Sequence, residues 1–254
     1  MAGGTGGATY DRIGRAYSRR RRPDPRLALP IAEALGDACT IVDVGAGAGS
    51  YEPAGRAVVG VDISMTMLRQ RPSSVGPAVL GRSEALPFSD ASFDAAMAVL
   101  TVHHWGDRAS GYREMRRVAR RQVVVTYEPS VHNDQWIVTD YVPEIAALDA
   151  GRPGLGVAEV VDALAPAVVH VLPIPADCVD GFIMAYWRRP EAFLDPEVRA
   201  CTSGFAMLDP GVVDRAMARL AADLGSGAWE DRHGALRAVD SYDCGLRLVV
   251  GGEA

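Results

Sequence analysis

Short apolar runs alternate with amphipathic segments between residues 38 and 128 of the chain. Five runs rich in Val, Ile, Ala or Met are typical of buried strands: Thr40 to Val44, Val58 to Val61, Ala78 to Leu80, Phe93 to Leu100 and Val123 to Tyr127. The pattern predicts helices over Ser64 to Arg71 and Asp107 to Arg120. Strands that alternate with helices predict right-handed βαβ units and a parallel sheet.

The chain after residue 128 is less regular. Val168 to Ile174 and Leu246 to Val250 are predicted strands, whereas Gly181 to Trp187 and Val212 to Leu224 are predicted helices. The sheet therefore resumes only after a helical insertion of roughly fifty residues, longer than a plain connection needs. Because specificity is usually carried by segments placed on a rigid scaffold, we expect this insertion to cover an active site.

Composition narrows the class of protein. The chain has 254 residues, 48% of them hydrophobic, which is enough for one large α/β domain or two small ones. A formal net charge of −6 argues against nucleic acid as a partner. The 4 cysteines form no C-x-x-C pair, so we expect no metal site. Without a transmembrane-length apolar stretch or a recognisable targeting signal, we expect a cytoplasmic protein that spans no membrane.

Three glycines at alternate positions, Gly45, Gly47 and Gly49, end the first predicted strand, and Asp62 ends the second. Glycine permits a sharp turn and a close approach of ligand to backbone, and an acid at this position can accept hydrogen bonds from ribose hydroxyls. The spacing is G-x-G-x-G, and Ser50 stands where a dinucleotide loop carries its third glycine. A nucleoside without phosphates fits better than NAD or FAD, although a tight turn with nothing bound is a further interpretation.

Several segments, in order and with matching spacing over about ninety residues, resemble the motifs of class I S-adenosylmethionine-dependent methyltransferases. These are Val42 to Gly49, Gly60 to Ser64 followed by Met67 and Leu68, Glu84 to Asp94, Leu100 to Trp105, and Arg113 to Val118. The similarity is greatest to the small-molecule subgroup that includes the ubiquinone- and menaquinone-type enzymes.

This resemblance implies a Rossmann-like α/β fold, a seven-stranded sheet with the last strand antiparallel, and a helical cap. It implies one methyltransferase domain over residues 1–254, an N-terminal lid segment over 1–30 and a substrate-cap insertion over 176–240. The implied cofactor is S-adenosyl-L-methionine, which leaves as S-adenosyl-L-homocysteine.

Transfer of the family's roles, residue by residue, gives a set of expected cofactor contacts. The glycine-loop residues Gly45, Ala46, Gly47 and Gly49 would line the methionine part, and Asp62 would hold the ribose. The adenine would lie between Ile63 and Met67, with Ser83 and Glu84 at its edge, Leu100 and Thr101 near the sulfonium, and Tyr17 and Arg21 reaching in from the lid. Arg82 stands where many relatives carry an acid that accepts from the adenine amine, which leaves the adenine contacts open.

His103 and His104 follow the fourth predicted strand, at the sheet edge where ligands of such folds bind. Either could be the base that removes a proton from an acceptor. Neighbours on a strand point to opposite faces, so we expect only one to face the pocket, and both could instead be structural. Tyr127, Trp136, Tyr186 and Trp187 are candidates for an aromatic wall around the acceptor, with core packing as the alternative for each.

The leading hypothesis is in-line transfer of a methyl group to O, N or C of a small organic molecule. An NAD- or FAD-dependent oxidoreductase, and a non-methylating S-adenosylmethionine-binding protein or cyclase on the same scaffold, are the alternatives. The sequence leaves open whether the protein is a monomer or a homodimer.

Overall fold

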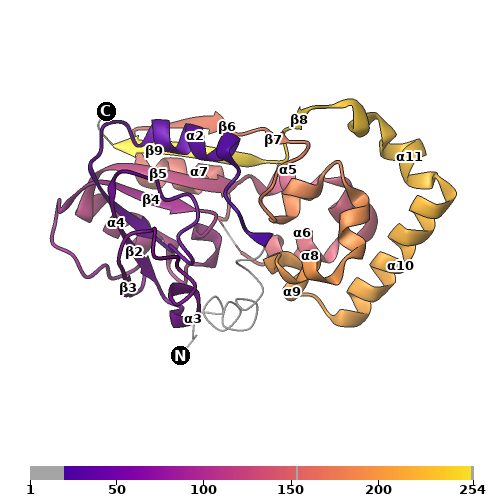
Figure 1. Cartoon of the computed structure of the whole chain (residues 1–254), viewed down its shortest axis with the longest axis horizontal. Coiled ribbons are helices and arrows are strands. Elements are labelled where there is room, and N and C mark those ends of the chain that lie inside the picture. Colours follow the sequence, from indigo (N-terminus) through magenta and orange to yellow (C-terminus); the bar gives the residue numbers. More distant parts are fainter. Residues whose placement is uncertain (1–19, 153, 253–254) are drawn as a thin grey trace.

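The computed structural model describes residues 20–152 and 154–252 of the chain. A β-sheet flanked by helices lies beside a helical cap, and the long helix α10 and the short helix α11 form the end of the cap farthest from the sheet (Figure 1). Tyr17, one of the predicted cofactor contacts, lies outside the described residues.

Seven strands form the main sheet, in the order β3-β2-β1-β4-β5-β9-β6. Their bounds are β1 Thr40–Val44, β2 Ala57–Asp62, β3 Ala78–Leu80, β4 Phe93–Val99, β5 Ala119–Tyr127, β6 Ala167–Val171 and β9 Leu246–Gly252. The first five pair in parallel, and β9 runs antiparallel to both of its neighbours, β5 and β6. The predicted seven-stranded sheet with an antiparallel last strand is confirmed.

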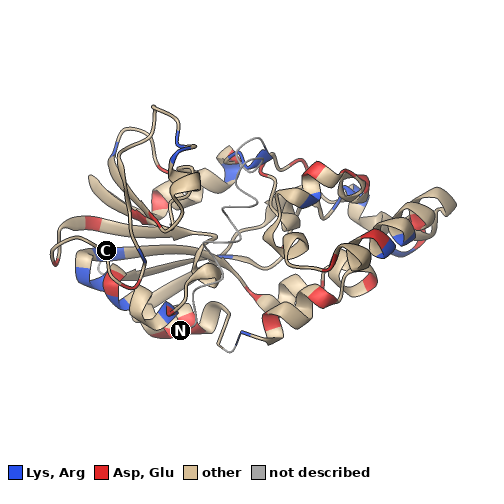
Figure 2. Ribbon diagram, turned by 90° about the horizontal axis from the view of Figure 1, so that it is seen from below, with Lys and Arg blue, Asp and Glu red and all other residues tan. Residues whose placement is uncertain are grey.

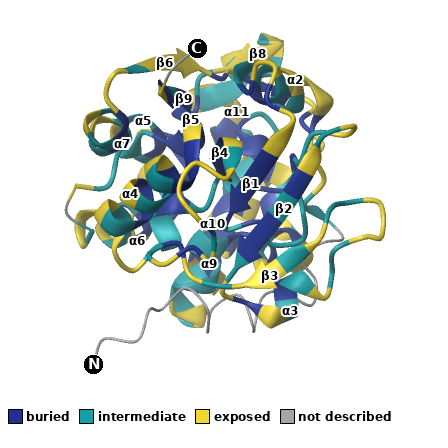
Figure 3. Cartoon of the chain, turned by 90° about the vertical axis from the view of Figure 1, so that its left-hand side faces the viewer, coloured by how far each residue is buried: buried dark blue, intermediate teal, exposed yellow. Residues whose placement is uncertain are grey.

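Helices cover both faces of this sheet. One face packs on α2 (Pro25–Ala34), and the other packs on α4 (Arg108–Val118) and α7 (Val157–Leu164). Successive strand residues point to opposite faces, so Ile41 belongs to the first core and Val42 to the second. Figure 3 shows β1 and β2 largely buried between these layers, as expected of parallel strands covered on both sides.

Two insertions build the cap. The first lies between β5 and α7 and contains α5 (Pro129–Asn133), the π-helix η2 (Ile137–Tyr141) and α6 (Glu144–Ala150). The second lies between the short strands β7 (Ile174–Pro175) and β8 (Ser241–Tyr242). It contains η3 (Ile183–Tyr186), η4 (Pro190–Leu194), α8 (Pro196–Ala200), α9 (Ser203–Ala206), α10 (Pro210–Ser226), α11 (Ala228–His233) and η5 (Gly234–Ala238).

The cap has a hydrophobic core of its own, in which Trp136 from the first insertion packs edge-on against Phe193 and Trp229 from the second. Acidic and basic residues both occur along α10 and α11 (Figure 2). Within residues 20–152 and 154–252, no helix is long and apolar enough to cross a membrane.

Several predicted elements have different bounds in the structure, among them the helix predicted over residues 64–71, of which only α3 (Met65–Leu68) forms. The strand predicted over residues 168–174 is divided into β6 and β7, because Pro173 between them has no N–H to continue the ladder. The helix predicted over residues 107–120 ends at Val118, where β5 begins directly. Only a 3₁₀ helix, Ile183–Tyr186, forms within the helix predicted over residues 181–187.

Candidate active site

The glycine loop leaves the carboxyl end of β1 as a tight turn. Gly45 and Gly47 have φ angles of 82° and 52°, in the left-handed region that favours glycine. The backbone N–H groups of Gly45 and Ala46 both donate to the Val61 carbonyl, which fixes the loop against β2. A Cβ atom at Gly45 would overlap the Thr101 side chain, so no larger residue fits there.

Turns, with no helix, connect this loop to residue 57 in the structure. The positive φ angles of Gly49, Tyr51 and Gly55 interrupt helical geometry in this stretch. The absence of a helix here affects which ligand the loop can bind. A pyrophosphate is held in dinucleotide folds by the N-terminus of a helix that follows the glycine loop, and the loop here lacks such a helix.

Asp62, at the end of β2, has its carboxylate fixed by two backbone groups. Its Oδ2 accepts from Gly47 N at 2.8 Å and its Oδ1 accepts from Ser64 N at 2.7 Å. Burial raises the pKa of Asp62, and the two backbone hydrogen bonds counteract part of that effect. A carboxylate has about four acceptor sites, so both oxygens can accept further hydrogen bonds from a ligand.

We call the cavity beside the glycine loop the first cavity. Nearly all predicted cofactor contacts that are described line it: Arg21, Gly45, Ala46, Gly47, Asp62, Ile63, Met67, Ser83, Glu84, Leu100 and Thr101. Gly49 is the exception, because it lies against Val75 and Arg71 instead. Glu84 also organises this cavity, since its Oε1 accepts from the N–H groups of Gly106 and Asp107, both at 3.1 Å.

Asp43 also lines the first cavity, although its position in the sequence predicted no role for it. Its side chain is buried and shares a hydrogen bond with Glu52, which in turn pairs with Arg71 at 2.7 Å. Burial, and then the neighbouring Glu52, raise the pKa of Asp43 well above its usual range. The sequence signal for this role is an acidic residue within the apolar run of β1. A carboxyl group buried there needs polar partners, which predicts a polar cluster beside the strand.

His103 and His104 lie in a 3₁₀ helix, η1 (Val102–His104), that follows β4. His104 lines the first cavity and His103 lines a second, so the two rings, 3.9 Å apart between centroids, serve different cavities. Burial is the main cause that lowers the pKa of His104 to about 3 and that of His103 well below its usual range. Both histidines are therefore neutral at pH 7.

The second cavity lies between the sheet edge and the cap. Its polar wall comes from β5, α5 and α6, where the Tyr127 hydroxyl donates to Asp149 Oδ1 at 2.8 Å. Its apolar wall includes Leu148, Phe182 and Met184. Two residues, Arg21 and Leu100, line both cavities. Leu100 holds a strained φ of 52°, and strain in a residue other than glycine is typical of functional sites.

Of the four predicted acceptor-wall aromatics, only Tyr127 lines the second cavity. The Trp136 indole N–H donates to the Trp187 carbonyl at 2.7 Å, and the Trp187 indole N–H donates to the Ile174 carbonyl at 3.1 Å. Tyr186 packs against Phe193 in the cap core. These contacts give Trp136, Tyr186 and Trp187 packing roles, because their rings are buried and line neither cavity.

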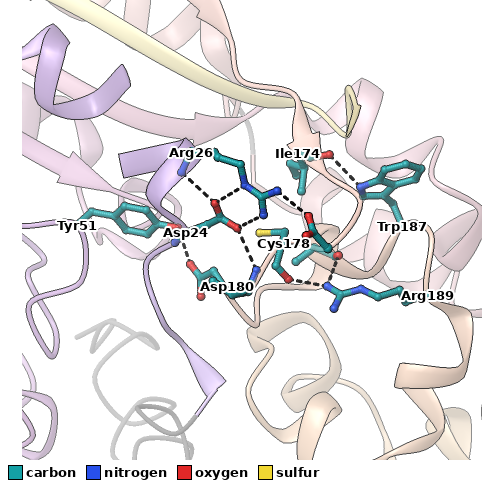
Figure 4. A network of polar contacts seen from close by, with 11 residues as sticks. Asp24, Arg26, Tyr51, Ile174, Cys178, Asp180, Trp187 and Arg189 are labelled. Carbon is teal, nitrogen blue, oxygen red and sulfur yellow. Dashed lines mark hydrogen bonds and ion pairs between the residues drawn. The ribbon is translucent and has the colours of Figure 1, made fainter. Parts of the chain in front are cut away.

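A polar network joins the glycine loop to the cap (Figure 4). Asp180, 1% exposed, accepts from the Tyr51 hydroxyl at 2.8 Å and pairs with Arg21 at 2.7 Å. Asp24 accepts from Val179 N and pairs with Arg26. The segment before α2 is therefore tied to residues 177–180 of the second insertion, and Arg21 is held at the boundary between the cavities.

Known proteins are similar to this chain in sequence and in fold. Residues 42–126 match the family model of a methyltransferase domain. A demethylmenaquinone methyltransferase of Corynebacterium kroppenstedtii is 38% identical over 125 residues, 44% of this chain and 55% of that protein. One of Roseiflexus castenholzii is 30% identical over 189 residues, 67% of this chain and 74% of that protein. The match thus spans about half the length of the first relative.

Among solved structures, a protein of Anabaena variabilis assigned to the methyltransferases of an antibiotic biosynthesis pathway aligns with a TM-score of 0.84. It is 30% identical, and the alignment covers 92% of this chain and 99% of that one. The chain belongs to the class I S-adenosylmethionine-dependent methyltransferases. The first cavity fits the cofactor of this family, because it offers a bare glycine backbone and the oriented carboxylate of Asp62 without a phosphate-binding helix.

Proposed function

We propose that this protein transfers the methyl group of S-adenosylmethionine to an oxygen, nitrogen or carbon atom of a small organic acceptor. The observation that supports this most is the pair of adjoining cavities that share Arg21 and Leu100. One cavity has the glycine loop and Asp62, and the other has the cap residues. Methyl transfer requires the cofactor and the acceptor to meet at one point, and two adjoining cavities allow this. A protein that only bound a nucleoside would need the first cavity alone.

In this proposal, Asp62 accepts hydrogen bonds from the ribose hydroxyls, and Gly45 to Gly47 let the ligand approach the backbone closely. Ile63, Met67, Ser83 and Glu84 surround the base, and Arg21, Leu100 and Thr101 lie toward the reacting end. The cofactor supplies an activated methyl group on a sulfonium. The chain's own contribution is to position the acceptor in line with that group and to exclude water, and well-oriented reactants gain up to roughly 7–11 kcal/mol.

His103 is the proposed proton acceptor where the methylated atom carries a proton. It lines the second cavity, and its buried Nδ1 has no hydrogen-bond partner among the described residues. Its lowered pKa keeps the ring neutral near pH 7, so that a nitrogen lone pair is available. The same low pKa makes the ring a weaker base than an imidazole in water, so we expect a contribution at the low end of the about 10²–10⁴-fold range of positioned bases. His104 lies on the cofactor side and is proposed to help close that cavity.

The domain roles follow from this arrangement. Residues 1–30 are proposed as a lid segment, anchored where Arg21 pairs with Asp180. Residues 176–240 are proposed as the substrate cap, together with the first insertion, because α6 contributes Leu148 and Asp149 to the second cavity. The dinucleotide-dependent oxidoreductase is not favoured, since the loop lacks the helix that would bind a pyrophosphate.

The experiment is a binding and turnover measurement on the full chain. Isothermal titration should detect S-adenosylhomocysteine but not NADH. A panel of phenols, amines and carboxylic acids with ¹³C-methyl-labelled S-adenosylmethionine should give a labelled product together with S-adenosylhomocysteine. Tight binding with no labelled product from any member of the panel would favour the non-methylating alternative, and binding of NADH alone would reject the proposal.

A further inference from the structure

Among the described residues, three charged side chains line the second cavity, and two of them already have partners. Arg21 pairs with the buried Asp180. Asp149 accepts from Tyr127 through Oδ1, and its Oδ2 is covered by the protein, 4.0 Å from His132 Nδ1. The free oxygen of Asp149 therefore faces His132 and is not exposed to the cavity.

Arg152, just after α6, is the third charged side chain. Its backbone N–H donates to the Asp149 carbonyl at 2.9 Å, which fixes the turn that carries it. Its half-buried guanidinium lies near the Tyr127 hydroxyl and 3.5 Å from the Met207 sulfur, and it makes no ion pair with any residue in 20–152 or 154–252. A guanidinium has five N–H donors, and a thioether is a weak acceptor, so donors are left for a ligand.

The surroundings of Arg152 make an unpaired cation costly. Ile145, Leu148, Phe182, Met184 and Met207 give the cavity a largely apolar lining. In such surroundings a charge is normally paired, because its hydration is reduced. The positive potential also extends to the neighbouring histidines. After burial and the neighbouring His104, Arg152 and Arg21 both contribute to the lowered pKa of His103. An anion would be stabilised at the same place.

We propose that Arg152 binds a carboxylate on the acceptor, so that the substrate of this site is a small, largely apolar organic acid. The inference rests on the proposed function, since it identifies the second cavity as the acceptor site. The planar fork of arginine matches a carboxylate through two parallel hydrogen bonds. The apolar wall would cover the rest of the molecule. One unpaired guanidinium suits the single charge of a carboxylate better than the two charges of a phosphate monoester.

The test compares acids with their neutral amides on the full chain. Phenylacetate and octanoate, each paired with its primary amide, are titrated calorimetrically into protein saturated with S-adenosylhomocysteine. We expect at least one acid to bind about 10- to 100-fold more tightly than its amide, the range that a hydrogen bond to a charged group supplies. Arg152→Gln should remove this preference by weakening acid binding alone, and Arg152→Lys should retain part of it.

Arg120→Gln is the matched control, because Arg120 is exposed and lies at the other end of β5 from Tyr127. It should leave the preference intact. S-adenosylhomocysteine affinity and the melting temperature of each variant show that the protein is folded, since Arg152 does not line the first cavity. The inference is overturned if wild type binds acids no better than amides, if neither acid binds, or if the preference survives in Arg152→Gln. Failure of S-adenosylhomocysteine to bind wild type would instead reject the proposed function.

Discussion

The two cavities are built in different ways. The first is made mainly from one contiguous stretch, residues 43–106, and relies on backbone atoms and on carboxylates held by backbone N–H groups. The second is assembled from side chains of separate segments, among them η1, α5, α6 and α9. A site made from backbone needs particular residues at fixed spacing, whereas a site made from side chains needs only a shape and a few charges. This contrast explains why the first cavity carries the family's sequence motifs, whereas the second is the cavity in which we propose that the acceptor is chosen.

The largest expected effect lies in the glycine loop. Gly45→Ala and Gly55→Ala both place a side chain at positive φ, 82° and 79°, which costs about 1–2 kcal/mol. Only at Gly45 would the new Cβ also overlap Thr101, whereas nothing lies within 4 Å at Gly55. Urea denaturation should show a loss above about 3 kcal/mol for Gly45→Ala, with loss of S-adenosylhomocysteine binding. Equal losses for the two variants would mean that the loop relaxes freely.

The network that joins the two regions gives the next largest effect. Asp180→Ala would remove the buried carboxylate that pairs with Arg21 and accepts from the Tyr51 hydroxyl, which should lower the free energy of unfolding by about 1.5–3 kcal/mol. Asp177→Ala is the matched control three residues earlier, because Asp177 also pairs with an arginine but is 82% exposed, and such pairs contribute about 0–1 kcal/mol. Thermal and urea unfolding measure both. Equal decreases in the free energy of unfolding for the two variants would contradict the role of Asp180 in joining the cap to the glycine loop.

Asp62→Asn should weaken S-adenosylhomocysteine binding by about 100-fold, since a charged acceptor of hydrogen bonds is replaced by an amide. Asp94→Asn controls for the structural part of this effect. Asp94 likewise accepts from two backbone N–H groups, those of Cys39 and Thr40, but it lies at the start of β4 and lines neither cavity. Calorimetric titration distinguishes the variants, and equal affinities would reject the role of Asp62.

The smallest expected effect is a pH dependence of stability. His104 has a pKa of about 3 when folded and about 6.5 when unfolded, so below pH 6.5 the unfolded chain binds a proton that the folded chain does not. The contribution of neutral His104 to the free energy of unfolding is therefore fully present above pH 6.5. Below pH 6.5 it decreases by up to about 1.4 kcal/mol per pH unit. His104→Gln should reduce the slope between pH 6.5 and 5, and the exposed His170→Gln should leave it unchanged. An unaltered slope in His104→Gln would contradict the burial of this ring.

The contrast between the cavities also explains what could be predicted from sequence. The alternation of apolar runs predicted the strands of the sheet, and the glycines with Asp62 predicted a nucleoside site, because both features depend on local geometry. Arg152 and Asp149 carry no motif, and they reach the second cavity only through the packing of the first insertion. Trp136, Tyr186 and Trp187 illustrate the same limit, since an aromatic residue in a cap can face a cavity or a core. Trp136 and Tyr186 lie in the cap core, and Trp187 lies in the core on the α2 side of the sheet.

A crystal structure of the full chain with S-adenosylhomocysteine would show whether the two cavities meet at the transferred methyl group. We expect the ribose hydroxyls within hydrogen-bond distance of the Asp62 carboxylate and the sulfur at Leu100, open to the second cavity. A ligand outside the first cavity, or a sulfur that faces away from the second, would contradict the claim that the two cavities form one methyl-transfer site.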